Sequence, residues 1–599
     1  MLRQNRSLTG DVSGRSANGF RMRMIVCFVT LLLAALPAAA QPTPQQGQPT
    51  FGGFGQGPGQ RPARDAAPPA TGTSRIRGRV IAGDTGQPLR RVNVRVTAPE
   101  LREMRSVSTD ADGRYEFKEL PAGRYTVTAT KNGYVQISYG QTRPNEGGKP
   151  LQLNEAQTVE RIDFALPRGG VITGRVIDEY GEPVANATVQ ALQFRFMNGV
   201  RGPVAFVAPS MTWDNGEFRI FGLSPGEYIV SATFRTMGPP DISDDRTGYV
   251  PTYYPGTASS AEAQRIRLDI GQTANDINIA LVQTRTARVS GIAVDADGRP
   301  LNGGFVMVMP RSMQNTGFVM VNAGGQVRAD GTFVIANMAP GEYVLRTPIA
   351  PRGGAAGTPL FAEAEVSVGG ADIDGVRLAP VSPITIRGRI VIDPAAAQTI
   401  TPASLRILAR PRRTNDAALM ASLGPAPAVH DDWSFEVKAP PGTIVIQPFG
   451  NAPGGNSGWV TRAVRLRGAD ITDTGVELRS GEDVDGVEIE ITTQVPTVTG
   501  AVTNSRGDRV SNYTVVLFPE DRQLWEIQGR ATSSRPDQEG QFRMTGLRAG
   551  SYYAAALEYV DAAEIANPEY LDRLAQRATR FSLREGETRT LDLKLMTDR

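Results

Sequence analysis

The chain has almost none of the residues on which most catalytic chemistry depends. Its 599 residues include one histidine, His430, and one cysteine, Cys27. A zinc site with two histidine ligands cannot be formed, and a Ser-His-Asp or Cys-His site would depend on His430, which stands alone in the loop 429–432. We therefore predict no catalytic residue, no metal site and no cofactor, and a protein that is not an enzyme.

The same scarcity excludes disulfides. Cys27 lies in an apolar N-terminal segment that we expect to be removed, so the mature chain has no thiol. Each domain must then be held together by its own hydrophobic core.

The chain also lacks an excess of positive or negative charge once the first 40 residues are left out. The net charge is +3, but the first 40 residues carry +4, which leaves −1 for the rest of the chain. A nucleic-acid-binding protein is expected to have a basic surface, so we exclude nucleic acid as a partner.

The N-terminus has the pattern of a secretory signal peptide. Residues 24–36 form an apolar run, preceded by Arg21 and Arg23 and followed by Pro37 and three alanines. The run is too short to span a bilayer comfortably. We predict a signal peptide over residues 1–40 with cleavage after Ala40, and a secreted or periplasmic protein without a transmembrane segment in the mature chain. An uncleaved anchor is the alternative.

Residues 41–73 are rich in proline, glycine and glutamine. Phe51 and Phe54 are their only large apolar residues. Such a segment cannot bury enough apolar surface to offset the entropy lost on ordering. We predict a disordered linker.

A pattern that occurs five times dominates the remaining chain. Each copy opens with a glycine followed within three residues by a β-branched residue, and the copies begin 96, 117, 97 and 112 residues apart. The opening glycines are Gly78, Gly174, Gly291, Gly388 and Gly500. These intervals are one domain long, and the 65 glycines and 43 prolines favour short strands joined by tight turns.

Two further motifs follow in each copy. The first is a hairpin turn, often Asp-Gly or Asn-Gly, that is followed by an aromatic residue. These aromatics are Tyr115, Phe218, Phe333, Phe435 and Phe542. The second motif is a six-residue segment with glycine at its fourth position and tyrosine at its sixth. These tyrosines are Tyr125, Tyr228, Tyr343 and Tyr552, whereas the fourth copy departs from the motif and has Ile444.

In the first three copies a turn of the form G-x-P, at residues 86–88, 181–183 and 298–300, lies between the opening and the hairpin. The order of these motifs, G-x-V, G-x-P, D-G-x-F and L-x-P-G-x-Y, resembles the carboxypeptidase-regulatory-like domain. The resemblance implies a seven-stranded, transthyretin-like sandwich that is grouped with carbohydrate-binding-like folds and is not itself catalytic. The motifs are also similar to the B-type repeats of collagen adhesins, some of which contain Lys–Asn isopeptide bonds. The second and third copies contain no lysine, so an isopeptide bond shared by all five copies is excluded.

We therefore predict an all-β chain of five tandem antiparallel, seven-stranded β-sandwiches of immunoglobulin-like or prealbumin-like type. The predicted domains, called repeats 1 to 5 below, are residues 74–167, 168–283, 284–380, 381–493 and 494–599. Repeat 5 is predicted to carry one short helix, because Asn567 can cap it, Pro568 suits its first position, and Leu571 and Leu574 fall on one face.

Five tyrosines in repeats 1 and 2 are the candidate ligand-binding residues. They lie in the long stretch before the last strand of each repeat and are Tyr134, Tyr139, Tyr249, Tyr253 and Tyr254. Aromatic faces on a loop suit stacking against sugar rings or partner side chains. The alternative is that they hold the loop to its own sandwich, and their exposure would distinguish the two.

Two functions follow from these observations. The first is an exported, non-enzymatic scaffold or protein-interaction rod, which the tandem repeats favour. The alternative is a carbohydrate-binding protein for cell-wall or environmental polysaccharide, which the resemblance and the tyrosines favour. The partner is accordingly a protein or a polysaccharide.

Overall fold

The structure is a computed structural model that describes residues 71–596. Some residues within that span are not described, namely 102–103, 144, 198–199, 206, 235–246, 296, 312–323, 350–359, 382, 395, 413–425, 451–457 and 528. The predicted signal peptide, its cleavage site after Ala40 and nearly all of the predicted linker lie outside the described residues.

Strands dominate the described residues, as the sequence predicts. Repeat 1 contains β1 (Ser74–Ala82), β2 (Asn93–Thr97), β3 (Arg105–Ser108), β4 (Arg114–Leu120), β5 (Gly123–Thr130), β6 (Ile137–Ser138), β7 (Leu151–Leu153), β8 (Thr158–Val159) and β9 (Phe164–Leu166). Repeat 2 contains β10 (Gly170–Ile177), β11 (Thr188–Met197), β12 (Val200–Ala205), β13 (Ser210–Met211), β14 (Glu217–Leu223), β15 (Gly226–Thr233), β16 (Thr247–Tyr249), β17 (Thr252–Tyr253), β18 (Ile266–Leu268), β19 (Thr273–Ala274) and β20 (Ile279–Ala280), and β21 (Gln283–Arg285) crosses its predicted boundary with repeat 3.

The same plan continues in the other three repeats. Repeat 3 contains β22 (Ala287–Ala293), β23 (Phe305–Pro310), β24 (Gly324–Gln326), β25 (Thr332–Met338), β26 (Gly341–Ile349), β27 (Leu360–Val368) and β28 (Ile373–Pro380). Repeat 4 contains β29 (Ile384–Ile392), η3 (Ala396–Gln398), η4 (Pro402–Ser404), β30 (Leu405–Pro411), β31 (Ser434–Ala439), β32 (Gly442–Gly450), β33 (Val460–Leu466), β34 (Ala469–Asp470), β35 (Val476–Leu478) and β36 (Val484–Thr492). Repeat 5 contains β37 (Thr497–Thr503), β38 (Arg509–Val510), β39 (Thr514–Pro519), η5 (Arg522–Leu524), β40 (Thr532–Ser534), β41 (Gln541–Thr545), β42 (Gly550–Leu557), η6 (Glu564–Ala566), α2 (Pro568–Ala575), β43 (Thr579–Leu583), β44 (Thr588–Thr590) and β45 (Leu593–Met596).

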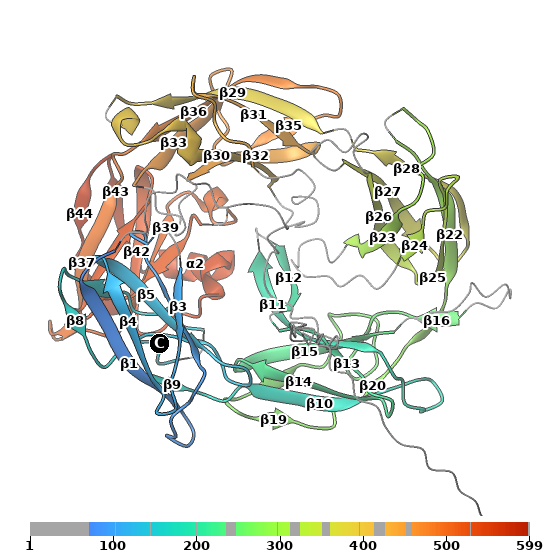
Figure 1. The fold of residues 1–599 in the computed structure, drawn as a ribbon, viewed down its shortest axis with the longest axis horizontal. Coiled ribbons are helices and arrows are strands. Elements are labelled where there is room, and N and C mark those ends of the chain that lie inside the picture. The colour runs from blue at the N-terminus through green and yellow to red at the C-terminus, as the bar shows by residue number, and fades with distance from the viewer. Residues whose placement is uncertain are drawn as a thin grey trace, which may run out of the picture. The chain divides into compact units, whose positions relative to one another are not determined.

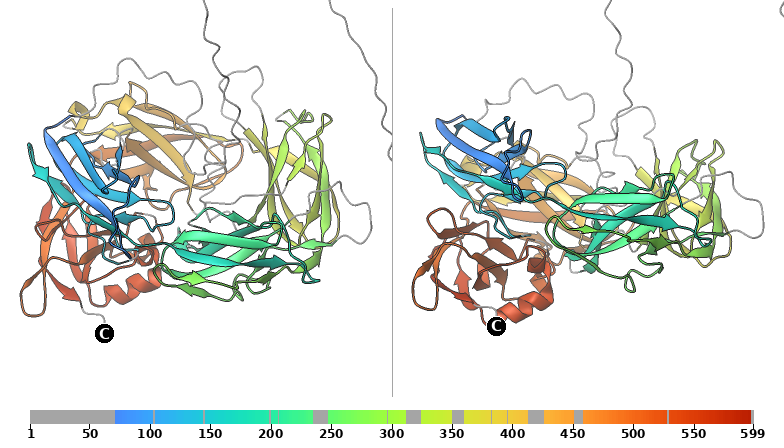
Figure 2. Two further views of the ribbon diagram at one scale, coloured as in Figure 1. Left: turned by 60° about the horizontal axis from the view of Figure 1, so that its bottom comes forward. Right: turned by 90° about the horizontal axis from the view of Figure 1, so that it is seen from below.

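In the part of the chain that the structure describes, the buried hydrophobic side chains form five main clusters, and each cluster draws on one predicted repeat. Their members run from Ile76 to Leu166, from Ile172 to Leu281, from Ala287 to Leu378, from Ile384 to Ile491 and from Val498 to Leu593. Figures 1 and 2 show that the coloured chain consists mainly of strands from its blue N-terminal part to its red C-terminal part. Each predicted repeat thus has a core of its own, while the boundaries between repeats stay a prediction.

The strands of repeats 1, 2 and 4 are divided into two main sheets. In repeat 1 the sheet orders are β4-β1-β8, with β9 also on β1, and β3-β2-β5-β6, with β7 also on β5. In repeats 3 and 5 a hydrogen-bonded path joins the two layers, through β27 and β28 in repeat 3 and through β45 in repeat 5. Seven strands, as predicted, are described in repeat 3, and the described parts of the other repeats have between eight and twelve.

A pairing that recurs in every repeat departs from the predicted antiparallel arrangement. In every repeat the opening strand pairs antiparallel with the strand after the hairpin turn, but parallel with the closing strand; in repeat 1 these partners of β1 are β4 and then β8 and β9. The other openings, β10, β22, β29 and β37, have the same two kinds of partner. A parallel pair needs a long crossover connection, and here the whole repeat supplies it.

The repeated glycine is explained by the close approach of the closing strand. A methyl group on Gly78 would lie 1.9 Å from the carbonyl oxygen of Ile162, where the closing strand is interrupted between β8 and β9. The corresponding distances at Gly174, Gly291, Gly388 and Gly500 are 2.1, 1.8, 2.1 and 1.8 Å, each to a backbone carbonyl oxygen of the closing segment. Real Cβ atoms do not approach this closely, so only glycine fits the position.

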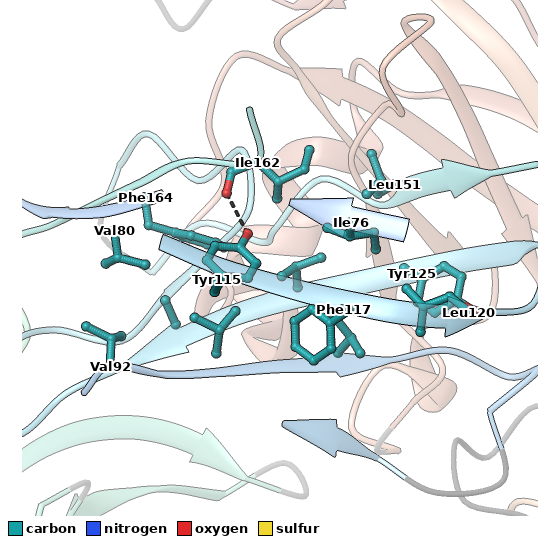
Figure 3. Packing of buried hydrophobic residues seen from close by; sticks show 14 of the residues in the cluster. Ile76, Val80, Val92, Tyr115, Phe117, Leu120, Tyr125, Leu151, Ile162 and Phe164 are labelled. Atoms are coloured by element: carbon teal, nitrogen blue, oxygen red, sulfur yellow. Dashed lines mark hydrogen bonds between the residues drawn. The ribbon is translucent and has the colours of Figure 1, made fainter. Parts of the chain in front are cut away.

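The aromatic residue of the hairpin motif fills the core beneath this contact. In repeat 1, Tyr115 is buried and its hydroxyl donates a hydrogen bond of 2.5 Å to the same Ile162 carbonyl, as Figure 3 shows. In repeats 3 and 4, the rings of Phe333 and Phe435 lie 3.0 and 2.7 Å from the position that a Cβ on the opening glycine would take. The glycine and the aromatic residue therefore form one packing unit.

The tyrosine of the last motif closes the turn before its strand. The Tyr125 hydroxyl donates to the carbonyl of Pro121, four residues earlier, at 2.7 Å. The equivalent bonds of Tyr228, Tyr343 and Tyr552 measure 2.7, 2.9 and 2.9 Å. A tyrosine that bonds back to nearby backbone in this way is a known corner of β-sandwiches. Repeat 4 has Ile444 here, which is buried and lacks the bond.

The predicted helix is present in repeat 5. Asn567 caps α2 by accepting a hydrogen bond of 3.0 Å from the backbone N–H of Glu569. Leu571 and Leu574 are buried and join a cluster with Phe518 of β39 and Tyr553 of β42, so the helix packs against that sheet (Figure 1).

Replacing the opening glycine of repeat 3 tests the close approach. We expect Gly291→Ala to destabilise repeat 3 by about 3 kcal/mol or more, because neither the Val376 carbonyl nor Phe333 can move without disturbing the core. Hydrogen exchange of repeat-3 peptides measures the effect. The matched control is Gly369→Ala, where an added methyl group meets no atom within 4 Å; its effect should stay within about 0.5 kcal/mol. Equal protection in both variants would contradict the explanation.

Candidate functional site

The five candidate tyrosines are packed against their own repeats. Tyr134 and Tyr139 are partly buried against the repeat-1 core, and Tyr249 and Tyr254 against the repeat-2 core. Tyr253 is 8% exposed and packs with Leu192 and Ile229 in a small separate cluster. None of the five is among the large hydrophobic residues that the described chain exposes.

Backbone bonds hold two of these tyrosines at equivalent places. The N–H of Tyr139 donates to Val127 of β5 at 2.8 Å, and the N–H of Tyr254 donates to Val230 of β15 at 2.9 Å. Each tyrosine therefore belongs to a segment that adds to the edge of the strand containing the corner tyrosine, Tyr125 in β5 or Tyr228 in β15. At this position the repeated aromatic residues help to hold the loop to the sheet of their own repeat.

Tyr249 and Tyr134 are held through their side chains as well. The Tyr249 hydroxyl donates to the Glu179 carboxylate at 2.5 Å, and burial, together with this bond, raises the pKa of Tyr249. The Arg168 guanidinium lies over the Tyr134 ring, 5.8 Å from its centre, and also pairs with Asp84 at 2.5 Å. Burial raises the pKa values of Tyr139 and Tyr253 too.

This geometry favours the alternative in which the tyrosines hold the long loops to their sandwiches. Ligand binding by them stays a prediction. The sequence indicated loops rich in tyrosine but could not indicate which way the rings face, because these segments alternate too briefly to define an inner and an outer side.

The structure exposes a different set of aromatic side chains on repeat 2, which sequence reasoning missed. Tyr180 is 83% exposed, Trp213 57% and Phe221 49%. Tyr180 and Trp213 lie in turns next to β10 and β14, and Phe221 lies within β14. The sequence offers only a tryptophan beside a turn motif as a signal, and a tryptophan in the core would give the same pattern.

His430 lies where the sequence predicts it, in an exposed turn of repeat 4. Its backbone bonds to Ser434 and Trp433 close that turn. Aspartates at the hairpin turns have a similar structural use: the carboxylate of Asp110 accepts hydrogen bonds from the backbone of Asp112 and Arg114 at 3.0 and 2.7 Å. Among the described residues, no group of three or more histidine, cysteine, aspartate or glutamate side chains could hold a metal ion.

Two cavities are lined by charged residues that are paired with one another. One, of about 480 Å³, contains four arginines and four carboxylates, with ion pairs such as Arg265–Glu227 at 3.1 Å and Arg195–Asp561 at 3.5 Å. The other, of about 430 Å³, contains Arg530 and Arg548, which both pair with Asp473. Burial lowers the pKa of Arg548 to about 10. The first cavity therefore has no excess of one sign, whereas the second is lined by three arginines and five carboxylates and has an excess of negative charge.

No helix in the described part of the chain is both long enough and apolar enough to span a membrane.

The fold and the repeated packing unit define a class, that of tandem β-sandwich proteins. Within this class, the family model of the carboxypeptidase regulatory-like domain matches residues 75–167 and 171–282, about a third of the chain. The match thus occurs in two copies, which coincide closely with repeats 1 and 2.

Similarity to known proteins is otherwise distant. Colossin-A of Dictyostelium discoideum is 21% identical over 285 residues, which is 44% of this chain and 2% of that protein. The chain thus spans a very small part of its curated relative. Among solved structures, the minor pilin GBS52 of Streptococcus agalactiae is 13% identical, with 36% of this chain and 98% of that chain covered and a TM-score of 0.21. A streptococcal ancillary pilin is 14% identical, with 51% and 98% covered and a TM-score of 0.20.

Truncating a buried and an exposed tyrosine of repeat 2 tests the placement of the candidate residues. We expect Tyr253→Ala to destabilise repeat 2 by about 3 kcal/mol, because it empties a packed site beside Leu192 and Ile229. Tyr180→Ala, at a position that is 83% exposed, should change stability by less than about 0.5 kcal/mol. Urea unfolding followed by hydrogen exchange in repeat 2 compares the two. Equal stability of both variants would show that Tyr253 is not packed as described.

Proposed function

We propose that this chain is an exported, non-enzymatic scaffold that binds other proteins through the surfaces of its β-sandwich repeats. One observation carries the proposal: the residues that recur from repeat to repeat are all used to build the sandwich. The glycines admit the closing strand, the hairpin aromatics fill the cores, and the corner tyrosines bond to the backbone. What the repeats have in common is therefore architecture, and what differs between them is surface.

The family assignment supports this proposal. The carboxypeptidase regulatory-like domain is a non-catalytic type of module, and the chain carries two matched copies followed by three segments with the same opening, hairpin and closing strands. Tandem β-sandwiches hold their surfaces at fixed intervals along the chain, which suits a protein that brings partners together.

Export is the second element of the proposal, and it is based on the N-terminal sequence. In cells, we expect the mature protein to begin at Gln41, because Ala38 and Ala40 are the small residues that signal peptidase requires. Mass spectrometry of the protein recovered from the periplasm or medium gives the first residue. The Ala38→Arg/Ala40→Arg variant should keep residues 1–40. A cytoplasmic protein that retains them in the unaltered chain would contradict export.

Carbohydrate binding is the second candidate, and the exposed aromatics of repeat 2 are the observation that favours it. Tyr180 and Trp213 present more than half of their surface to solvent, and stacking on such rings is how many proteins hold sugars. This site differs from the one that the sequence suggested. The exposed pair can be removed without emptying a core, which makes a clean test possible.

A glycan panel separates the two candidates. If the chain is a protein scaffold, the full-length protein should show no saturable binding to cell-wall or environmental polysaccharides. Saturable binding that is lost in a folded Tyr180→Ala/Trp213→Ala variant would favour the carbohydrate function at the exposed site. Loss only in the variant with alanine at Tyr134, Tyr139, Tyr249, Tyr253 and Tyr254 would place that function at the predicted tyrosines, provided that the variant remains folded.

A further inference from the structure

The loop of residues 140–149 in repeat 1 contacts repeat 5, which lies more than 340 residues further along the chain. Nothing in the repeated motifs predicts this contact, because the loop has no counterpart in the pattern shared by the repeats. The contact consists of a buried ion pair with polar contacts on either side.

The buried ion pair joins Glu146 and Arg535. The Glu146 carboxylate lies 3.0 Å from the Arg535 guanidinium, and the two side chains are 0% and 1% exposed. Arg535 also donates to the backbone carbonyls of Gly140 and Gly147 at 2.7 and 3.2 Å. Burial lowers the pKa of Arg535, while the charge of Glu146 opposes that shift.

Each ion is held in place by its own repeat. The Glu146 carboxylate accepts bonds from the backbone of Thr142 and Arg143 at 2.9 and 3.2 Å. On the other side, Arg535 donates to the side chain of Asn512. Groups of its own repeat thus restrain each partner, and such restraint reduces the entropy lost on binding.

A second group of contacts lies next to the ion pair. Arg143 pairs with Glu558 at 2.7 Å and lies over the ring of Tyr559, 5.4 Å from its centre. The backbone carbonyl of Asn145 accepts a bond of 3.0 Å from the N–H of Ala562. These contacts use the segment between β42 and α2.

A third group extends the surface along β7. Gln152 and Gln538 bond reciprocally: the backbone N–H of Gln152 donates to the Gln538 amide oxygen at 3.1 Å, and the Gln538 amide N–H donates to the Gln152 carbonyl at 2.9 Å. The Lys149 ammonium donates to the carbonyl of Ser511 at 2.7 Å. These backbone and side-chain groups of the two repeats are therefore paired across the surface.

We propose that repeats 1 and 5 of one chain bind each other through this surface, and that the Glu146–Arg535 pair makes the binding specific. A mismatched surface that covered Glu146 or Arg535 would leave a buried charge without its partner, which is strongly unfavourable. Because both repeats belong to one chain, their association does not require a second molecule. The first and last repeats are then held together, and an extended rod forms only when this surface is opened.

Crosslinking between two introduced cysteines tests the proposal in the full-length chain. With Cys27 replaced by serine, Gln152→Cys and Gln538→Cys provide the only thiols, at exposed positions that face each other. A short bismaleimide should crosslink them within one chain, in a yield that does not change on dilution. The matched control pairs Gln152→Cys with Ala329→Cys, in an exposed turn of repeat 3, and should give no crosslink. Covalent dimers alone, or no crosslink, would overturn intramolecular binding.

The role of the ion pair is tested in the same chain across urea concentrations that leave the repeats folded. The docked fraction is the fraction of chains in which repeats 1 and 5 are bound to each other. Arg535→Ala should reduce it by at least about tenfold, because this change leaves Glu146 buried without a counter-charge. The urea concentration that abolishes the crosslink should fall accordingly. Arg387→Ala removes an exposed arginine that pairs with Glu436 in repeat 4, and it should leave this concentration unchanged.

A second variant covers the possibility that Arg535→Ala unfolds repeat 5. Arg143 is 48% exposed, so Arg143→Glu should leave both repeats folded while placing a like charge opposite Glu558. We expect the docked fraction to fall by about two- to fivefold. If both variants remain folded and the crosslink persists to the same urea concentration as in the parent, the proposed surface is wrong.

Discussion

The approach of the closing strand to the glycine of the opening strand is the constraint on which the rest of each repeat depends. The closing strand places a carbonyl oxygen where any side chain on Gly78, Gly174, Gly291, Gly388 or Gly500 would stand. The parallel pair at this point joins the two ends of the repeat, and the hairpin aromatic packs beneath it. The sandwich is therefore closed at the place where its chain enters and leaves.

This constraint also explains why the repeats share so little besides their motifs. Once the opening glycine, the hairpin aromatic and the corner tyrosine are in place, the remaining core needs only apolar side chains that alternate along the strands. Repeat 4 shows that the sandwich can form without the corner tyrosine, because this repeat keeps Gly388 and Phe435 but has Ile444 in place of the tyrosine. The surface and the longer connections are free to differ.

Those connections carry the features that distinguish one repeat from another. In repeat 1, the segment between β6 and β7 presents Glu146 to Arg535 of repeat 5, while repeat 2 exposes Tyr180 and Trp213 in the connections next to β10 and β14. Loops on a rigid scaffold commonly carry binding, because changes in them leave the core intact. A non-enzymatic scaffold with different surfaces on related repeats is consistent with this division.

The sequence by itself determined the all-β class, the recurrence of the packing unit and the capped helix at Asn567, because glycine sterics, turn chemistry and period-two alternation act over a few residues. It could not determine the parallel partner of each opening strand, since pairing between the two ends of a repeat leaves no local pattern. The exposure of the tyrosines was also undetermined, because short loop segments take their orientation from the sheet they join. The contact of Glu146 with Arg535 was decided only by the tertiary structure, which brings together two charges that look like ordinary surface residues in the sequence.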